Sequence, residues 1–142
     1  MTVSDILNEK GRDVVTVLDS IRVEDAVRVM DERRIGAVVV LNDAGAVRGI
    51  LSERDVMHRI GREGAAALWA RVSECMTERL VTCVPTDTVD GVMTTMTQRR
   101  IRHLPVIEQD NLAGMISIGD VVKRRIDQAE HEVADLMEYI AS

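Results

Sequence analysis

A Gly-x-x-Ser-x-x-Asp pattern occurs twice in the chain, ending at Asp55 and at Asp120. In each copy the glycine lies in an apolar run, and a glycine lets a ligand or another backbone come close. The serine, Ser52 or Ser117, is placed to begin a helix, so the aspartate lies in the first helical turn. A carboxylate there can accept hydrogen bonds from two adjacent hydroxyl groups, as in a ribose diol. The pattern therefore predicts a sugar site in each half of the chain.

The same residues also fit a purely structural interpretation. A serine followed three residues later by an acid is a capping box, in which both side chains bind free backbone N–H groups at the start of a helix. Such caps are common, and a duplicated fold duplicates its caps as well as its sites. The sequence alone leaves both interpretations open.

Two neighbouring cations, Arg102 and His103, precede an apolar run in the second half, where the first half has Gly36 and Ala37. A cation pair beside an apolar cleft can bind phosphate. The alternative is a solvated strand edge. If phosphate does bind, this difference between the halves predicts two unequal sites.

Several other kinds of site are missing from the sequence. Neither the G-x-x-x-x-G-K nor the G-x-G-x-x-G phosphate loop occurs. Cys75 and Cys83 have no histidine nearby, so we expect no metal site. No nucleophile stands beside a base, and we expect no catalytic residue and no enzyme activity. The net charge of −6 and the aromatic content of 1% argue against nucleic-acid binding.

The chain has the features of a cytoplasmic protein. Residues Met1–Asn8 have no basic run followed by a long apolar stretch, so we expect no signal peptide. The longest uncharged apolar run, Ile35–Leu41, is too short to cross a bilayer. Two cysteines are too few for a disulfide framework. Because the longest apolar run is too short to cross a bilayer, we expect no contact with a membrane.

A repeat of about 60 residues positions the candidate site residues. Val14–Val17 aligns with Leu80–Cys83, and Arg34-Ile35 aligns with Arg100-Ile101. The two Gly-x-x-Ser-x-x-Asp patterns also align, and apolar residues recur at the same places in both copies. Such an ordered match predicts two similar units in the 142 residues.

Each repeat is predicted to form a strand, a helix, two strands and a helix. In the first copy Val14–Leu18 is a β-branched run, and apolar residues recur at helical spacing from Val23 to Met30. Ala37–Leu41 and Val47–Leu51 flank turn residues and predict a hairpin. The second copy has the corresponding segments Leu80–Cys83, Val89–Met96, Leu104–Ile107 and Leu112–Ile116.

The predicted fold is α+β, with two three-stranded sheets that are too small to bury their faces alone and that pack together. We divide the chain into residues 1–60 (repeat 1), 61–71 (linker), 72–125 (repeat 2) and 126–142 (extension). The extension belongs to a long amphipathic helix that begins near Val121, continues to Ile140 and could pack on a partner chain.

The tandem unit resembles a pair of cystathionine-β-synthase (CBS) domains, also called a Bateman module. The most specific likeness is in residues 49–55, 114–120 and 100–106, and Met76-Thr77 is also typical. The resemblance covers about Val3 to Lys123. It implies β-α-β-β-α repeats with pseudo-twofold symmetry and two clefts between them. With no catalytic domain, channel or transporter beside it, the chain resembles a stand-alone CBS-pair protein.

This resemblance implies adenosine ligands: AMP, ADP, ATP, an NAD(H)-type dinucleotide or S-adenosylmethionine. It implies that Asp55 and Asp120 bind ribose with the help of Ser52 and Ser117, and that the opposite repeat contributes the walls around adenine. For the Asp55 cleft the implied residues are Thr77, Val81 and Ile101, with Arg102 and His103 near phosphate. For the Asp120 cleft they are Arg12, Val15, Ile35 and Ala37. Gly36-Ala37 offers no cation, so Arg12 or Arg54 is the candidate phosphate contact there.

We therefore expect a regulatory sensor that binds an adenine nucleotide, changes the angle between its halves or its subunits, and so alters an unidentified protein partner. The family also implies a homodimer, a disc of four repeats joined through the helices that flank the clefts. The alternative is a ligand-free structural or interaction dimer. In that case the Ser/Asp pairs are only caps, and the terminal helix binds the partner.

Overall fold

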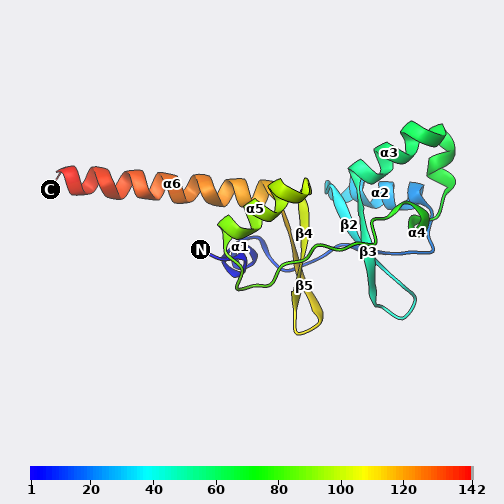
Figure 1. Ribbon diagram of the computed structural model, residues 1–142, viewed down its shortest axis with the longest axis horizontal. Helices are drawn as coiled ribbons and strands as arrows, with labels where there is room; N and C mark the ends of the chain where they lie inside the picture. The colour runs from blue at the N-terminus through cyan, green and yellow to red at the C-terminus, as the bar shows by residue number, and fades with distance from the viewer. Residues whose placement is uncertain (142) are drawn as a thin grey trace. The chain divides into compact units, whose positions relative to one another are not determined.

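The computed structural model describes residues 1–141, which form helices and strands in two compact units (Figure 1). One unit is Val14–Val81. The other combines Met1–Asp13 with the chain from Thr82 onward. The α+β class predicted from the sequence is confirmed. The predicted division into residues 1–60, 61–71, 72–125 and 126–142 stays a prediction. The two compact units of the structure do not test it, because they reflect packing and not sequence similarity.

The unit Val14–Val81 contains a three-stranded sheet in the order β1-β2-β3. β1 runs parallel to β2, and β2 runs antiparallel to β3, as the predicted hairpin requires. The strands are β1 (Thr16–Leu18), β2 (Ala37–Leu41) and β3 (Val47–Ser52). The helices are α2 (Val23–Arg33), α3 (Glu53–Glu63), the 3-10 helix η1 (Gly64–Trp69) and α4 (Val72–Cys75).

The core of this unit forms around β2, the central strand. Val38, Val39 and Val40 are fully buried, because a strand covered on both faces needs apolar residues at successive positions. Leu51 on β3 and Val72 on α4 are also fully buried. The Ala- and Gly-rich segment 61–71 is ordered, since it forms the end of α3 and then η1.

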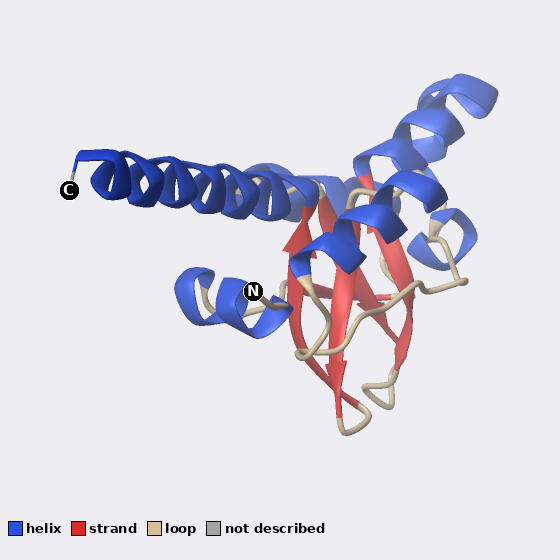
Figure 2. Cartoon of the chain, turned by 60° about the vertical axis from the view of Figure 1, so that its left-hand side comes forward, coloured by secondary structure: helices blue, strands red, loops and turns tan. Residues whose placement is uncertain are grey.

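The second unit has a two-stranded antiparallel sheet of β4 (His103–Glu108) and β5 (Asn111–Ser117). Its helices are α1 (Val3–Lys10), α5 (Val89–Arg99) and α6 (Ile118–Ala141), drawn together with the strands in Figure 2. The first residues of the chain belong here because the Val3 amide donates to the Asp87 carbonyl over 2.9 Å and Thr2 pairs with Thr88. Leu7 of α1 is buried.

The prediction of three strands in the second sheet is wrong. In place of a strand, Cys83 forms a single parallel bridge with Val106. In this bridge the Cys83 amide donates to the Pro105 carbonyl over 3.0 Å, and the Cys83 carbonyl accepts from the Ile107 amide over 2.9 Å. In the first sheet the pairing of β1 with β2 continues at both ends, because the Val39 amide donates to the Val15 carbonyl and the Asp19 amide donates to the Leu41 carbonyl.

The two prolines of the chain explain the difference between the sheets. By the alignment of the repeats, Pro105 stands where Val39 does, and Pro85 stands where Asp19 does. Proline has no backbone N–H, so both flanking hydrogen bonds of the ladder are lost. The segment Leu80–Cys83 therefore keeps one bridge and does not form a strand.

Among residues 1–141, no helix combines the length and the apolar character that crossing a bilayer requires.

Candidate functional site

Ser52 and Asp55 form a complete capping box at the start of α3. The Asp55 carboxylate oxygen Oδ2 accepts hydrogen bonds from the Ser52 amide over 2.9 Å and from the Ser52 hydroxyl over 3.0 Å. The Asp55 amide donates back to Ser52 Oγ over 3.2 Å. The capping box that the spacing predicts is therefore present, and Asp55 stays half-buried at the surface of the unit.

Ser117 and Asp120 repeat this geometry almost atom for atom at the start of α6. Asp120 Oδ2 accepts from the Ser117 amide over 2.8 Å and from its hydroxyl over 3.0 Å, and the Asp120 amide donates to Ser117 Oγ over 3.2 Å. The duplicated sequence pattern thus produces the same local structure twice. What distinguishes the two aspartates is the next contact of each.

Asp55 receives a neutral donor through its second oxygen. Thr77 Oγ1 donates to Asp55 Oδ1 over 3.0 Å. Thr77 is positioned by two backbone hydrogen bonds with Ile50, of 2.8 and 3.0 Å. Gly49 permits this approach, because a Cβ atom at that position would lie 2.5 Å from the Thr77 carbonyl oxygen. The structure thus brings Ser52, Asp55 and Thr77 together in one unit, and their role in a ligand site stays a prediction.

Asp120 receives a cation instead. Lys10 Nζ lies 2.7 Å from Asp120 Oδ2 and also donates to the Met115 carbonyl over 2.9 Å. Burial by itself raises the pKa of Asp120, but the hydrogen bond and charge of Lys10, with the hydrogen bonds from Ser117, outweigh burial and lower the pKa below its ordinary value. Lys10 lies 110 residues away and matches no motif, so the sequence did not predict this contact.

The remaining predicted site residues are divided between the units. Val15, Ile35, Ala37, Arg54 and Val81 belong to the unit of Asp55, whereas Arg12, Ile101, Arg102 and His103 belong to the unit of Asp120.

Within each unit, one of these segments lies beside the serine. Ala37 pairs with Ser52, and His103 pairs with Ser117. The Ile118 amide donates to the Arg102 carbonyl over 2.8 Å, and the Arg12 side chain donates to Asn8 over 3.2 Å. The assignment of residues to opposite clefts stays a prediction.

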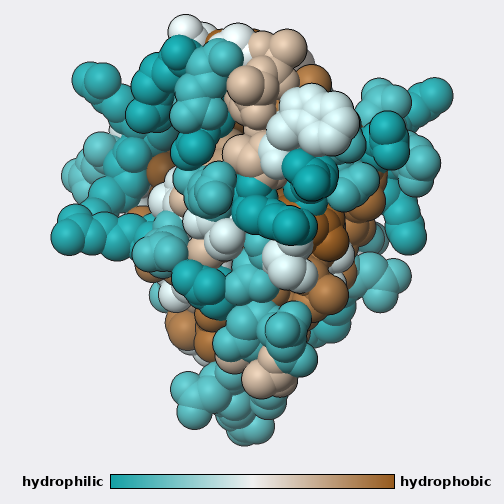
Figure 3. Space-filling model, turned by 90° about the vertical axis from the view of Figure 1, so that its right-hand side faces the viewer, coloured by the Kyte–Doolittle hydropathy of each residue, from teal (hydrophilic) through white to brown (hydrophobic). Residues whose placement is uncertain are grey.

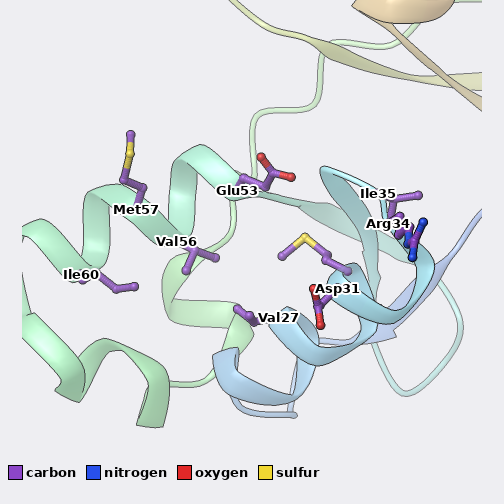
Figure 4. A pocket seen from close by; sticks show the side chains of 9 residues that line it. Val27, Asp31, Arg34, Ile35, Glu53, Val56, Met57 and Ile60 are labelled. Atoms are coloured by element: carbon purple, nitrogen blue, oxygen red, sulfur yellow. The ribbon is translucent and has the colours of Figure 1, made fainter.

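An apolar groove of about 580 Å³ lies between α2 and α3, and the sequence did not predict it. In Figure 4, Val27 of α2 and Val56 of α3 point toward the space between the two helices. Figure 3 shows hydrophobic atoms interrupting a mainly hydrophilic face at the end of the molecule where α3 lies. The groove is lined by Val27, Met30, Asp31, Arg34, Ile35, Glu53, Val56, Met57 and Ile60. Ile35 is the one candidate site residue among them.

Both cysteines are free thiols. Burial raises the pKa of Cys83 to about 12, with a smaller effect from the nearby Asp87 charge. Burial, and then the charge of Asp55, also raise the pKa of Cys75. In the described part of the chain, no three His, Cys, Asp or Glu side chains come together as metal ligands.

Comparison with known proteins gives consistent matches to one family. The CBS domain family matches residues 3–62 and 72–127. The mitochondrial CBS domain-containing protein CBSX3 of Arabidopsis thaliana is 36% identical over 98% of this chain and 71% of its own length. The crystal structure of the CBS-domain containing protein ATU1752 from Agrobacterium tumefaciens is 47% identical, with a TM-score of 0.86 over 87% of this chain and 92% of that one.

A more distant solved structure shares the fold. It is the CBS domain pair of protein MJ0100, solved in complex with 5-methylthioadenosine and S-adenosyl-L-methionine. It is 19% identical, with a TM-score of 0.79 over 90% of this chain and 98% of that chain. The family match covers most of the residues, and it places one domain on each sequence repeat. The chain therefore belongs to the CBS-domain family, as a pair of CBS domains.

Proposed function

We propose that the chain is a regulatory module that binds an adenosine-containing ligand through the carboxylates of Asp55 and Asp120. The observation that carries this proposal is the half-buried Asp55 carboxylate, whose second oxygen is held by the Thr77 hydroxyl over 3.0 Å. A ribose hydroxyl can take the place of this hydroxyl without changing the number of hydrogen bonds. The capping role and the binding role are thus compatible, because they use different carboxylate oxygens.

The candidate ligands are AMP, ADP, ATP, an NAD(H)-type dinucleotide and S-adenosylmethionine. Thr77, Val81 and Ile101 are proposed to surround adenine in the Asp55 cleft, with Arg102 and His103 near phosphate. Arg12, Val15, Ile35 and Ala37 are proposed for the Asp120 cleft, with Arg12 or Arg54 contacting phosphate. The adenosine complexes of the MJ0100 domain pair support this class of ligand.

The proposed action is regulation of a protein partner and not catalysis. A ligand that prefers one arrangement of the CBS domains shifts the population toward it, and the partner responds to that arrangement. We propose that the module works in the cytoplasm as a homodimer, a disc of four repeats joined through the helices that flank the clefts. The apolar groove between α2 and α3 supports a contact through those helices, since a surface of this kind is suited to a protein partner.

Calorimetric titration with AMP, ATP, NADH and S-adenosylmethionine tests this function. We expect Asp55→Asn and Asp120→Asn each to remove one binding site, because a charge-assisted hydrogen bond contributes about 1.5–3 kcal/mol. Asp25→Asn is the matched control, since Asp25 accepts from the Arg22 amide in the cap of α2 but belongs to no proposed site. No heat with any of the four compounds, or equal losses in all three variants, rejects the proposal.

A ligand-free interaction dimer is the second candidate function, favoured by the exposed apolar side chains of α6. Leu136 and Met137 are 59% and 67% exposed. This candidate predicts intact assembly without nucleotide binding. The two functions separate in the same titration, because only the first requires the carboxylates.

A further inference from the structure

Among the described residues of its unit, nothing covers the apolar face of the second half of α6. The helix begins in the core, where Val121 is fully buried, but residues 129–141 are all exposed. In Figures 1 and 2 this part of α6 runs past the other elements of its unit. Val133 and Ile140 are 56% and 74% exposed. Apolar side chains gathered on one exposed helix face mark a contact surface.

The apolar residues of this face follow a heptad repeat. Their spacing alternates between four and three residues along the whole exposed part of the helix, which is the pattern of a coiled-coil seam. The seam consists of Val122, Ile126, Ala129, Val133, Leu136 and Ile140. In heptad terms Ile126, Val133 and Ile140 are a positions, and the other three are d positions. All three a residues are β-branched, and Leu136 is a leucine at a d position. β-Branched residues at a with leucine at d favour two parallel strands.

We propose that this seam binds the same seam of a second copy of the chain, forming a parallel two-stranded coiled coil. A self-complementary heptad stripe identifies its own partner, because the knobs of one helix fit the holes of an identical one. The seam is shorter than three heptads, so its contribution is moderate and adds to any other contact between copies. This inference does not rest on the proposed nucleotide binding.

The charges beside the seam support the parallel orientation. Arg125 is a g position and Glu130 is the following e position. A parallel pair places Arg125 of each copy opposite Glu130 of the other, which is the favourable g–e arrangement. An antiparallel pair centred on the seam instead places Glu130 opposite Glu130 and Glu132 opposite Glu132. Like charges in such positions destabilise the pairing.

Arg125 can leave its contacts within its own chain to pair with Glu130 of a second copy. Within its own chain it contacts Asp90 over 3.3 Å and Gln128 over 3.2 Å, with 43% of the Arg125 side chain and 72% of the Asp90 side chain exposed. Ion pairs at this exposure contribute little to stability. Asp90→Asn removes the internal ion pair without touching the seam, so it serves as a control.

Disulfide trapping tests the seam directly in the full chain. Ile140→Cys places a thiol at an a position, where two parallel helices bring identical residues within disulfide distance. We expect mild oxidation to give a dimer on a non-reducing gel, with a 140–140 disulfide found by mass spectrometry. Glu138→Cys is the matched control, because position 138 lies on the outer face of the helix and retains the same two native thiols. Absence of the 140–140 disulfide, or equal trapping at position 138, overturns the proposal.

Charge reversal on the Ile140→Cys background tests the orientation. We expect Arg125→Glu and Glu130→Arg each to slow the trapping by about threefold to tenfold, and the double change to restore it. Asp90→Asn is expected to leave the rate unchanged. Independent slowing by the two reversals, without restoration in the double variant, contradicts the parallel pairing. Circular dichroism verifies that every variant is folded.

Discussion

The starts of α3 and α6 have the same sequence pattern and the same capping geometry but different electrostatics. Asp55 accepts a hydrogen bond from the neutral Thr77 hydroxyl over 3.0 Å, whereas Asp120 is paired with the ammonium group of Lys10 over 2.7 Å. The bonds accepted by Asp55 are shared between its two oxygens. The three bonds accepted by Asp120 from Ser117 and Lys10 all end on Oδ2.

This comparison shows that duplication preserves the hydrogen bonds of a helix cap but not the contacts that surround the cap. The cap depends on residues three positions apart, so copying the sequence copies it. The next contact comes from the other repeat, from Thr77 for Asp55 and from Lys10 for Asp120, and it differs between the copies. A ligand at Asp55 exchanges one neutral hydroxyl for another, while a ligand at Asp120 meets a carboxylate that already has a cation. We therefore expect the two sites to have unequal affinities.

The largest effect is expected at the glycines that precede the two caps. Gly49→Ala brings Cβ to 2.5 Å from the backbone oxygen of Thr77, a residue that two backbone hydrogen bonds with Ile50 hold in place. Gly114→Ala brings Cβ to 2.7 Å from the end of the Leu7 side chain, which can rotate. We expect losses of about 3 kcal/mol for Gly49→Ala and about 1 kcal/mol for Gly114→Ala, because overpacking against backbone is harder to relieve. Urea denaturation measures both.

Gly61→Ala provides the control for this pair. Gly61 lies inside α3, and a Cβ atom there meets nothing within 4 Å. Alanine is the better helix former, so we expect a gain of about 0.5–1 kcal/mol. Equal losses at Gly49 and Gly114 would contradict the distinction between a backbone contact and a side-chain contact.

The sequence predicted what is local in this molecule. The repeat, the hairpins, the helix starts at Ser52 and Ser117 and the α+β class all follow from spacing and residue type within a few positions. Thr77 was found beside Asp55 only through resemblance to a family. Lys10 was missed, because no local pattern links a residue at the end of α1 to a carboxylate 110 residues later.

The missing third strand was predictable in principle. Pro85 and Pro105 are visible in the sequence, but their effect depends on which amides the ladder uses, and only the first repeat shows that register. The groove between α2 and α3 was not predictable in the same way. Helical spacing identifies Val27 and Met30 as apolar, but it does not say whether another element covers them.

A smaller effect is expected from removing the cation beside Asp120. The lowered pKa of Asp120 means that the folded state holds its proton less tightly than the unfolded state. Its contribution to stability is therefore present above the ordinary value of 3.8 and is lost as the pH falls through the folded pKa. We expect Lys10→Met to cost under about 1 kcal/mol near neutral pH, since the pair is partly exposed to solvent.

Acid denaturation of the Lys10→Met variant measures this contribution. We expect the difference from the native chain to shrink as the pH falls from about 5 to about 2. In an Asp120→Asn background, Lys10→Met should leave the pH dependence unchanged, because the carboxylate is gone. A difference that persists at the lowest pH would show that Lys10 acts through its bond to the Met115 carbonyl instead.

The smallest effect on stability is expected where the two sheets differ. Pro105→Val restores an N–H at the position where Val39 donates to Val15 in the first sheet over 3.1 Å. A new hydrogen bond from this amide stabilises the fold by about 1 kcal/mol. Removing proline raises the conformational entropy of the unfolded chain, which destabilises the fold by a similar amount, about 0.4–1 kcal/mol. The two terms nearly cancel, so the informative measurement is hydrogen exchange at residue 105. A protected amide shows that proline alone interrupts the third strand. An amide that exchanges as fast as those of exposed loops shows that restoring the N–H does not extend the pairing of Cys83 with β4.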